Sequence, residues 1–381
     1  MPKFLKNLSD WFEKHIGLHR IGIAVGVTVF AIAAFVLYRI LRKISIAEVG
    51  HAISSVTWTQ LALAAFFVAL AYLTLTFYDY FALKTIGREE VPYHIAAVGG
   101  FTSYSIGHNV GFTAFSGGAV RYRIYSASSG LSAVEVAKLC FIAGLTFWLG
   151  NIAVLGLGMT IHPEAASMVD QLPPAVNRVI GIGLLTALAV YTYYVSVKPR
   201  VIGRSNWSVT LPAGRLTILQ ILIGIVDLTC CSLAMYVLMP VSPKLDFISL
   251  AVIFVSSTLL GFASHSPGGL GVFDAAMLIA LPQFAPEQLL ASLLLFRLFY
   301  FIAPFAISLV IIVIREFVLD IKPPAQEMPP PREVNASHVV AKIAEARKED
   351  ASKAGKVRKS ASAKTSVKKA AKPKSAKRKS K

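Results

Sequence analysis

Long apolar runs recur along this chain, and they restrict it to one class of fold. About 18 or more apolar residues in a row are enough to cross a bilayer as a helix. Hydrophobic residues make up 55% of the 381 positions, and the mean hydropathy is +0.63. The sequence therefore predicts an all-α polytopic membrane protein with about eight transmembrane helices. The predicted crossings are Ile21–Tyr38, Thr59–Leu83, Val134–Ile161, Val179–Val197, Leu216–Met239, Phe247–Ala263, Gly268–Leu281 and Leu289–Ile314.

The stretch Ala263–Asp274 (ASHSPGGLGVFD) interrupts the apolar pattern. A proline and three glycines cannot continue a helix cheaply, and at bilayer depth a broken backbone is tolerated only where it is covered by protein or lines a cavity. The helix that restarts after the break would offer its free amides to an anion. A tight turn would also explain the glycines, but not the nearby His265 and Asp274.

Residues 91–129 are too polar for a lipid-facing crossing and too apolar for a long soluble loop, so they predict a re-entrant hairpin. Within them, Ser116, Gly117 and Gly118 precede Arg121 and Arg123. This order predicts a flexible backbone, then a helix start, then basic side chains, as in the stretch above.

Ionisable residues inside membrane segments are costly and are candidates for function. They are Asp79, Arg121, Arg123, Asp227, Asp274 and Arg297. Arg297 either binds a lipid phosphate bidentately or forms a buried ion pair with Asp227 or Asp274. Both hypotheses stay open. His265 is either a proton relay or a neutral side chain that donates to a carbonyl.

Composition divides the chain into three parts. Residues 1–20 predict an interfacial amphipathic helix, residues 21–321 the transmembrane domain, and residues 322–381 a disordered tail. The tail holds 18 of the 38 basic residues and 5 of the 20 acidic ones, so we expect it in the cytoplasm against anionic lipid, with nucleic acid as the alternative. The three cysteines lie in apolar runs, and we expect neither a metal nor a cofactor.

Three segments resemble the signatures of the lysylphosphatidylglycerol synthase transmembrane family. They are Ser116–Arg123 (SGGAVRYR), Pro267–Asp274 (PGGLGVFD) and Arg297–Tyr300 (RLFY), in matching order. The family includes the flippase half of the bacterial multiple peptide resistance factor and stand-alone members associated with hopanoid or glycolipid pathways. The resemblance implies an eight-span helical fold with re-entrant elements and a lipid-translocating cavity. Full-length relatives add an aminoacyl-tRNA-dependent transferase domain, which this chain lacks, and usually have glutamate at the position of Asp274.

The residues and the resemblance together predict a non-enzymatic lipid flippase of the bacterial inner membrane, for an anionic or aminoacylated phospholipid. Arginines and helix starts would hold the headgroup phosphate, and aspartates would neutralise the arginines or hold a cationic headgroup. The predicted substrate site consists of Gly117, Gly118, Arg121, Arg123, Asp227, His265, Pro267, Gly268, Gly269, Gly271, Asp274 and Arg297.

Two alternatives come from other classes of protein. One is an accessory subunit that holds lipid for a partner enzyme. The other is a membrane-embedded lipid transferase that uses His265 and Asp274, which the lack of a recognisable nucleophile disfavours. The expected partners are membrane phospholipid, the anionic lipid surface through the basic tail, a lipid-modifying enzyme and a second copy of the chain.

The distribution of basic residues beside the crossings predicts that both termini are cytoplasmic and that His162–Arg178 is external, although the basic residues at 39–43 then fall outside. A cysteine introduced at Ser167 should therefore react with an impermeant thiol reagent on intact cells, and one at Ser205 should not. Protection of Ser167 together with labelling of Ser205 would contradict this orientation.

Overall fold

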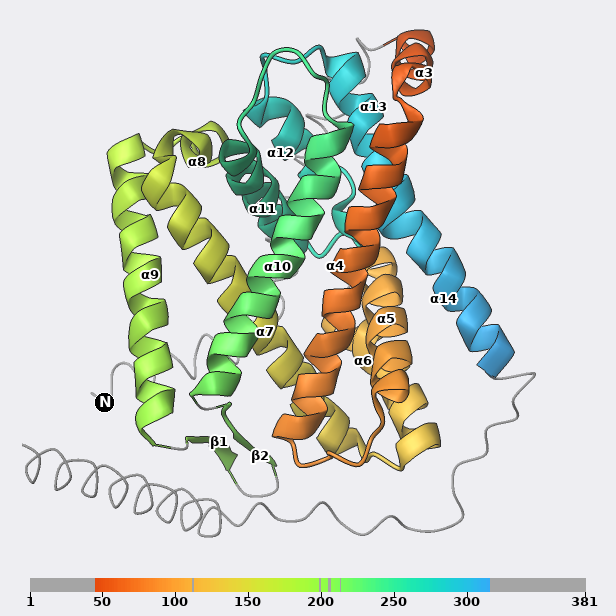
Figure 1. Cartoon of the computed structure of the whole chain (residues 1–381), viewed down its shortest axis with the longest axis vertical. Coiled ribbons are helices and arrows are strands. Elements are labelled where there is room, and N and C mark those ends of the chain that lie inside the picture. Colours follow the sequence, from red (N-terminus) through yellow and green to blue (C-terminus); the bar gives the residue numbers. More distant parts are fainter. Residues whose placement is uncertain (1–44, 112, 199, 205–206, 213, 316–381) are drawn as a thin grey trace, which may run out of the picture. The chain divides into compact units, whose positions relative to one another are not determined.

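The computed structural model describes residues 45–315, apart from residues 112, 199, 205–206 and 213, and its elements are labelled in Figure 1. The predicted interfacial helix 1–20, the first predicted crossing (Ile21–Tyr38) and the tail 322–381 lie outside these residues. The described helices are α3 (Ile46–Ser55), α4 (Trp58–Thr85), α5 (Tyr93–Val110), α6 (Thr113–Ser129), α7 (Ala133–Ile161), α8 (Pro163–Asp170), α9 (Pro174–Val197), α10 (Arg215–Leu238), α11 (Phe247–Ala263), η1 (Pro267–Gly269), α12 (Val272–Ala280), α13 (Pro286–Arg297), η2 (Leu298–Ile302) and α14 (Ala303–Val313).

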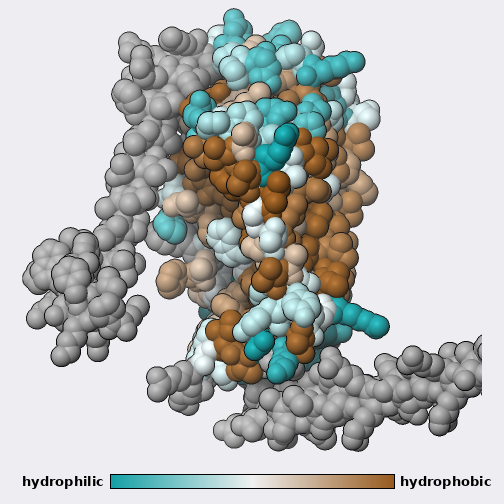
Figure 2. Space-filling view, turned by 90° about the vertical axis from the view of Figure 1, so that its left-hand side faces the viewer, coloured by the Kyte–Doolittle hydropathy of each residue, from teal (hydrophilic) through white to brown (hydrophobic). Residues whose placement is uncertain are grey.

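Five of these helical segments are long and apolar enough to cross a membrane: α4, α7, α9, α10 and the continuous run Pro286–Val313 formed by α13, η2 and α14. The prediction of an all-α polytopic membrane protein is confirmed. Figure 2 shows apolar side chains over much of the middle of the face that carries α9, with hydrophilic side chains gathered toward its ends. On α9 the side chains of Val179, Val190 and Tyr193 are exposed, as expected for a helix that borders lipid.

The long helices start at side-chain caps that the sequence encodes. Thr57 and Gln60 form a capping box at the start of α4, and Ser132 and Glu135 form another at the start of α7. The carboxylate of Glu135 also accepts a 2.6 Å hydrogen bond from Nε of Arg88, in the loop after α4. This bond raises the pKa of the Arg88 guanidinium, and it ties the α4–α5 loop to α7.

The centre of the bundle is formed by α4, α7 and α10, which pack against one another. Glycines permit the closest crossing. A Cβ placed on Gly150 of α7 would lie 2.7 Å from Cα of Gly224 on α10, so the two backbones are almost in contact. Small residues are the usual means by which membrane helices approach this closely.

The predicted re-entrant hairpin is present as α5 and α6, which pack on each other and lie in the lower part of Figure 1. Its break, however, is not where the sequence analysis placed it. Gly117 and Gly118 lie inside α6, whereas α5 ends at Gly111 with a φ of 82°. Gly117 instead permits close packing of the two arms, because a Cβ there would lie 3.0 Å from the carbonyl oxygen of Ser103 on α5.

A second hairpin is formed by α11, η1 and α12. The sequence analysis treats Phe247–Ala263 and Gly268–Leu281 as two crossings, but α12 has only nine residues. A helix of that length rises about 14 Å, which is roughly half of the hydrocarbon core. The two segments pack together in the upper part of Figure 1 as the arms of one hairpin. Exchanging two crossings for a hairpin moves the connection at residues 264–267 from the cytoplasmic face to the hairpin tip and leaves the predicted sidedness of the other loops unchanged.

The tips of the two hairpins meet inside the bundle. A Cβ on Gly111, at the tip of the first hairpin, would lie 3.3 Å from the carbonyl oxygen of His265 and from Cα of Pro267, at the tip of the second. The hairpins therefore approach from opposite ends of the bundle, and their broken backbones are in direct contact (Figure 1).

Between α9 and α10 the sequence analysis expected only a basic loop. The chain there forms two short antiparallel strands, β1 (Val201–Arg204) and β2 (Trp207–Thr210), in the register Val201↔Thr210 to Arg204↔Trp207. The ring of Trp207 packs edge-on against Phe141 of α7, with 5.6 Å between the centroids. This contact anchors the hairpin to the bundle.

The crossing of α7 and α10 yields a matched pair of substitutions. Gly150→Ala should lower the midpoint of thermal unfolding of the purified protein, because the added methyl group meets the backbone of α10. Gly144→Ala, on the same helix with nothing within 4 Å, should leave it unchanged or raise it, because alanine is the better helix former by roughly 1 kcal/mol. Equal midpoints for the two variants would contradict this account of the packing.

Candidate functional site

The break between α11 and α12 depends on three residues in the left-handed region of backbone space. Gly268, Gly269 and Gly271 have φ values of 58°, 62° and 82°. Only glycine adopts these values without strain. The amide of Gly271 donates a 3.0 Å hydrogen bond to Oδ2 of Asp274, which caps the start of α12. The sequence PGGLGVFD therefore encodes both the reversal of the chain and the restart of the helix.

Arg297 of α13 holds this break in place. Its Nε and Nη2 donate to the two carboxylate oxygens of Asp274 at 2.9 and 2.7 Å, and its Nη1 donates to the carbonyl oxygen of Gly268 at 3.0 Å. Both side chains are buried. The hypothesis of an Arg297–Asp274 ion pair is confirmed, and Asp227 is not the partner. The Asp274 carboxylate lies over the start of α12, where the sequence analysis expected a lipid phosphate.

A second buried pair lies near the other end of the bundle. Nε and Nη2 of Arg121 donate to the carboxylate of Asp79 at 2.8–3.2 Å, and the hydroxyl of Tyr125 donates to Oδ2 of Asp79 at 2.8 Å. The Arg121 guanidinium also lies over the ring of Tyr104, 4.5 Å from its centroid. The sequence analysis treated Asp79 as a charge inside a crossing but left it out of the site, because it follows a tyrosine near the helix end. The pairing requirement of a buried arginine was the signal that could have found it.

The other predicted site residues do not form one cluster. Arg123 is exposed on α6, two positions beyond the buried Arg121. His265 is exposed at the tip of the second hairpin with a φ of 54°, and Pro267 beside it is also exposed. Gly118 faces Sγ of Cys140 on α7, 3.7 Å from a Cβ placed there. Asp227 lies in the interior between α10 and α4 and contacts neither buried arginine.

The helix that carries Arg297 is itself interrupted directly after it. Residues Leu298–Ile302 form a π-helical turn, and Pro304 follows. Pro304 has no amide to donate to the carbonyl of Tyr300, and the hydroxyl of Tyr72 donates to that oxygen instead, at 2.9 Å. Nδ2 of Asn109, close to the tip of the first hairpin, donates to the carbonyl oxygen of Phe301 at 3.0 Å. The carbonyl oxygens of Tyr300 and Phe301 at this interruption are therefore bonded to side chains of neighbouring helices.

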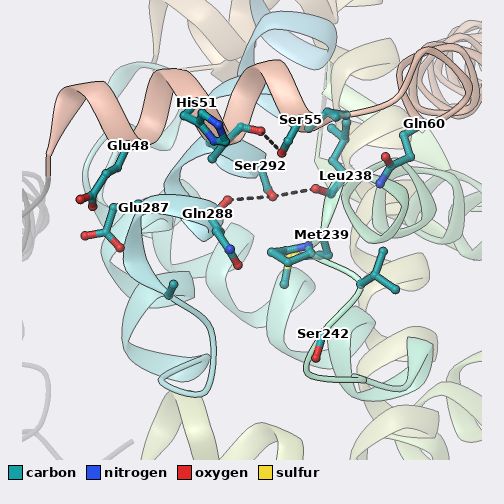
Figure 3. Close-up of a pocket in the computed structure, with 16 residues that line it drawn as sticks. Glu48, His51, Ser55, Gln60, Leu238, Met239, Ser242, Glu287, Gln288 and Ser292 are labelled. Carbon is teal, nitrogen blue, oxygen red and sulfur yellow. Dashed lines mark hydrogen bonds between the residues drawn. The ribbon is translucent and has the colours of Figure 1, made fainter.

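A pocket of about 690 Å³ opens at the upper end of the bundle, between α3, the start of α4, the end of α10 and the start of α13. Figure 3 shows Glu48 and Glu287 on the same side of this pocket, with His51 and Gln288 nearby. Its lining residues include no lysine and no arginine. The pocket wall is closed by the hydroxyl of Ser292, which donates to the carbonyl oxygen of Leu238 at 2.6 Å. None of the predicted site residues lies in it.

The pocket and the Arg121–Asp79 pair lie at different levels along the bundle. Gln60, which lines the pocket, and Asp79 lie on the same helix, α4. Nineteen residues of α-helix between them correspond to about 28 Å, close to the thickness of a hydrocarbon core. The described residues hold no group of three or more His, Cys, Asp or Glu side chains suited to a metal ion.

Comparison with known proteins agrees with this architecture. The family profile described as the lysylphosphatidylglycerol synthase TM region matches residues 23–308. The chain is 30% identical to the uncharacterized protein slr0712 of Synechocystis over 284 residues, 74% of this chain and 87% of that protein. It is 28% identical to the inner membrane protein YbhN of Escherichia coli over 289 residues, 74% of this chain and 88% of that protein. It is also 26% identical to the phosphatidylglycerol lysyltransferase of Staphylococcus aureus over 300 residues, which cover 76% of this chain but only 33% of that relative.

The Arg297–Asp274 pair predicts a non-additive result in a double-mutant cycle. Arg297→Ala or Asp274→Ala alone leaves a buried charge without its partner and should destabilise the purified protein by about 3–5 kcal/mol. The double variant should lose less than the sum of the two, since no orphan charge remains. Thermal unfolding in detergent provides the measurement.

A cross-pair cycle serves as the control. Arg297→Ala combined with Asp79→Ala disrupts two pairs that share no residue, so these effects should add. Additivity within the Arg297–Asp274 cycle would show that the pair is not an energetic unit.

Proposed function

The chain belongs to the lysylphosphatidylglycerol synthase transmembrane family, and we propose that it moves a phospholipid headgroup across the bacterial inner membrane. The observation that carries this proposal is the contact between the two hairpin tips, Gly111 against His265 and Pro267, midway through the bundle. Hairpins that enter from opposite ends with their tips in contact would form a barrier between the two sides at those tips. Separation of the tips would open a route for a polar headgroup while the five long helices stay in place.

The two buried ion pairs supply a chemical reason for phosphate binding. Each arginine offers a planar fork of donors that fits phosphate as well as carboxylate. In the closed arrangement Asp274 and Asp79 occupy those forks. We propose that a headgroup phosphate competes with Asp274 for Arg297. Because Arg297 also holds the carbonyl of Gly268, this exchange would loosen the tip of the second hairpin.

The acidic pocket suits the other half of a zwitterionic or aminoacylated headgroup. Glu48 and Glu287 line it, and its described lining residues include His51 but no lysine or arginine, so it would favour an ammonium group at the upper end of the bundle. We therefore propose a phospholipid with a phosphate and an amine as the substrate class. Lysyltransferase activity is not part of this proposal, because the similarity covers only 33% of the Staphylococcus aureus enzyme.

The second candidate is an accessory subunit that binds lipid without moving it. The complete pairing of Arg121 and Arg297 favours it, since the two ion pairs also join α6 to α4 and α13 to α12. The two functions differ in one measurable property. A binding subunit would purify with lipid yet leave the exchange of lipid between leaflets at the rate of protein-free vesicles.

The transport test uses the full chain reconstituted in vesicles with phosphatidylethanolamine, whose headgroup carries both a phosphate and an amine. The lipid is labelled with a fluorophore on an acyl chain, and dithionite bleaches the outer leaflet. Gly269→Val should abolish leaflet exchange, because Gly269 has a φ of 62° and a Cβ there would lie 3.4 Å from Cα of Gly261. Arg297→Lys should reduce exchange at least tenfold, because an ammonium cannot hold Asp274, Gly268 and a phosphate as a fork does. Gly183→Val, on α9 with nothing within 4 Å, is the matched control and should exchange lipid normally.

Each variant is checked for folding by its thermal unfolding midpoint before transport is compared. If both Gly269→Val and Arg297→Ala exchange lipid at the wild-type rate, the assignment of this site to lipid transport is wrong. Wild-type protein that binds lipid but accelerates no exchange would favour the accessory subunit.

A further inference from the structure

One buried carboxylate has no part in either ion pair. Asp227 lies in the middle of α10, 3% exposed, where α10 packs along α4. The sequence analysis gave it the task of neutralising an arginine, but Asp79 and Asp274 perform that task. Within the part of the chain that the structure describes, no lysine, arginine or histidine contacts the Asp227 carboxylate. Its role has to be found in its own surroundings.

The polar contacts of Asp227 are few. The hydroxyl of Tyr78 donates to Oδ2 at 3.0 Å, the hydroxyl of Thr74 also interacts with the carboxylate, and the thiol of Cys231 lies 3.9 Å from Oδ1. An ionised carboxylate can accept about four hydrogen bonds, and a charge inside the membrane requires a partner. Two hydroxyls and one weak thiol donor supply neither four strong bonds nor an opposite charge. A neutral carboxylic acid fits the same surroundings well.

The groups that face Asp227 from neighbouring elements are also uncharged at physiological pH. Those with which it interacts electrostatically are Tyr72 and Tyr78 of α4, Tyr104 of α5, Tyr300 of η2, and Cys230 and Cys231 of α10. The helices α7, α11 and α13 also pack on α10. The acidic and basic side chains of these three helices are Glu135 and Lys138 of α7 and Glu287 and Arg297 of α13. Glu135 is paired with Arg88, and Arg297 is paired with Asp274.

A series of polar groups connects this site to the hairpin tips. The ring of Tyr300 stacks on His108 of α5, with 6.1 Å between the centroids and 20° between the planes. His108 lies three residues before Gly111, where the tips touch. Nδ1 of His108 and the hydroxyl oxygen of Ser105 are buried and find no hydrogen-bond partner in the described residues. Such atoms mark a place where water or a proton can enter when the tips separate.

We propose that Asp227 is a proton-binding site, which holds a proton while the hairpin tips are in contact and releases it when they separate. Closed tips keep water away and favour the neutral acid, whereas open tips admit water and favour the carboxylate. Protons then act as a second ligand that binds the closed state better, so acid favours closure and alkali favours opening. The coupling of this site to lipid movement rests on the proposed function, but proton binding itself does not.

The first test measures protonation directly in the purified full chain. At neutral pH the infrared spectrum should contain the carbonyl band of a protonated carboxylic acid. Asp227→Asn should lose the band and still fold, because the neutral amide can accept the bond from Tyr78. Asp246→Asn, a change at the exposed cap of α11 that retains a capping side chain, should keep the band.

The wild-type spectrum is decisive even where Asp227→Asn fails to fold, and Asp227→Glu should then shift the band rather than remove it. Absence of the band from the wild-type protein, or its persistence in Asp227→Asn, would overturn the proposal.

The second test imposes a proton gradient on vesicles that contain the same acyl-labelled phosphatidylethanolamine. The wild-type exchange rate should differ at least about fivefold between the two directions of the gradient, and Asp227→Asn should exchange lipid at the same rate in both. A wild-type rate indifferent to the gradient would refute the coupling. If the infrared band is assigned to Asp227 but no gradient produces any lipid exchange, the proposed function fails and the proton site stands.

Discussion

The architecture depends on how broken backbone is satisfied at bilayer depth, where no water replaces a missing hydrogen bond. The chain interrupts its helices at Gly111, at Pro267–Gly271 and at the π turn before Pro304. Side chains from other helices take over the exposed groups. Arg297 binds the carbonyl of Gly268, and the hydroxyl of Tyr72 binds the carbonyl of Tyr300. The polar residues of this membrane domain are therefore first of all the partners of its irregular backbone.

Arg297 holds the irregular backbone and is also the proposed ligand of the phosphate, and these two roles link the structure to the proposed transport. Arg297 cannot bind a phosphate fully without loosening its hold on Asp274 and Gly268. A headgroup that enters would thus compete with the same bonds that keep the second hairpin closed, so binding and opening would be one event. The glycine contact between α7 and α10 has the opposite character. Close backbone packing, together with a 2.8 Å hydrogen bond from Nε2 of Gln220 on α10 to Oγ1 of Thr146 on α7, leaves those long helices as the fixed frame around which the hairpins can move.

The sequence predicts the helical membrane class, the interruption at Pro267–Gly271 and the existence of the first hairpin, because apolar length and glycine–proline chemistry are local properties. The break of the first hairpin lies at Gly111, not at the predicted Gly117 and Gly118. The sequence also predicts that Arg297 needs an acidic partner, but it could not choose between Asp227 and Asp274, because that choice depends on which helices meet. Asp79 was missed for the same reason, since its partner lies 42 positions away on α6. The second hairpin was taken for two crossings because hydropathy does not record how far into the bilayer a short apolar helix such as α12 reaches. The π turn and the strands β1 and β2 leave no clear local signal.

The placement of the two ion pairs has a consequence for the synthesis of the chain. Asp79 and Arg121 are 42 positions apart in the first half of the described region, and Asp274 and Arg297 are 23 positions apart in the second. Each pair therefore closes among helices that leave the ribosome close together. The early hairpin can enter the bilayer with its charge already neutralised, long before its counterpart has been translated. The uncharged contact of Gly111 with His265 and Pro267 has to wait for the late hairpin, as do the hydrogen bonds of Tyr72 and Asn109 to the π turn.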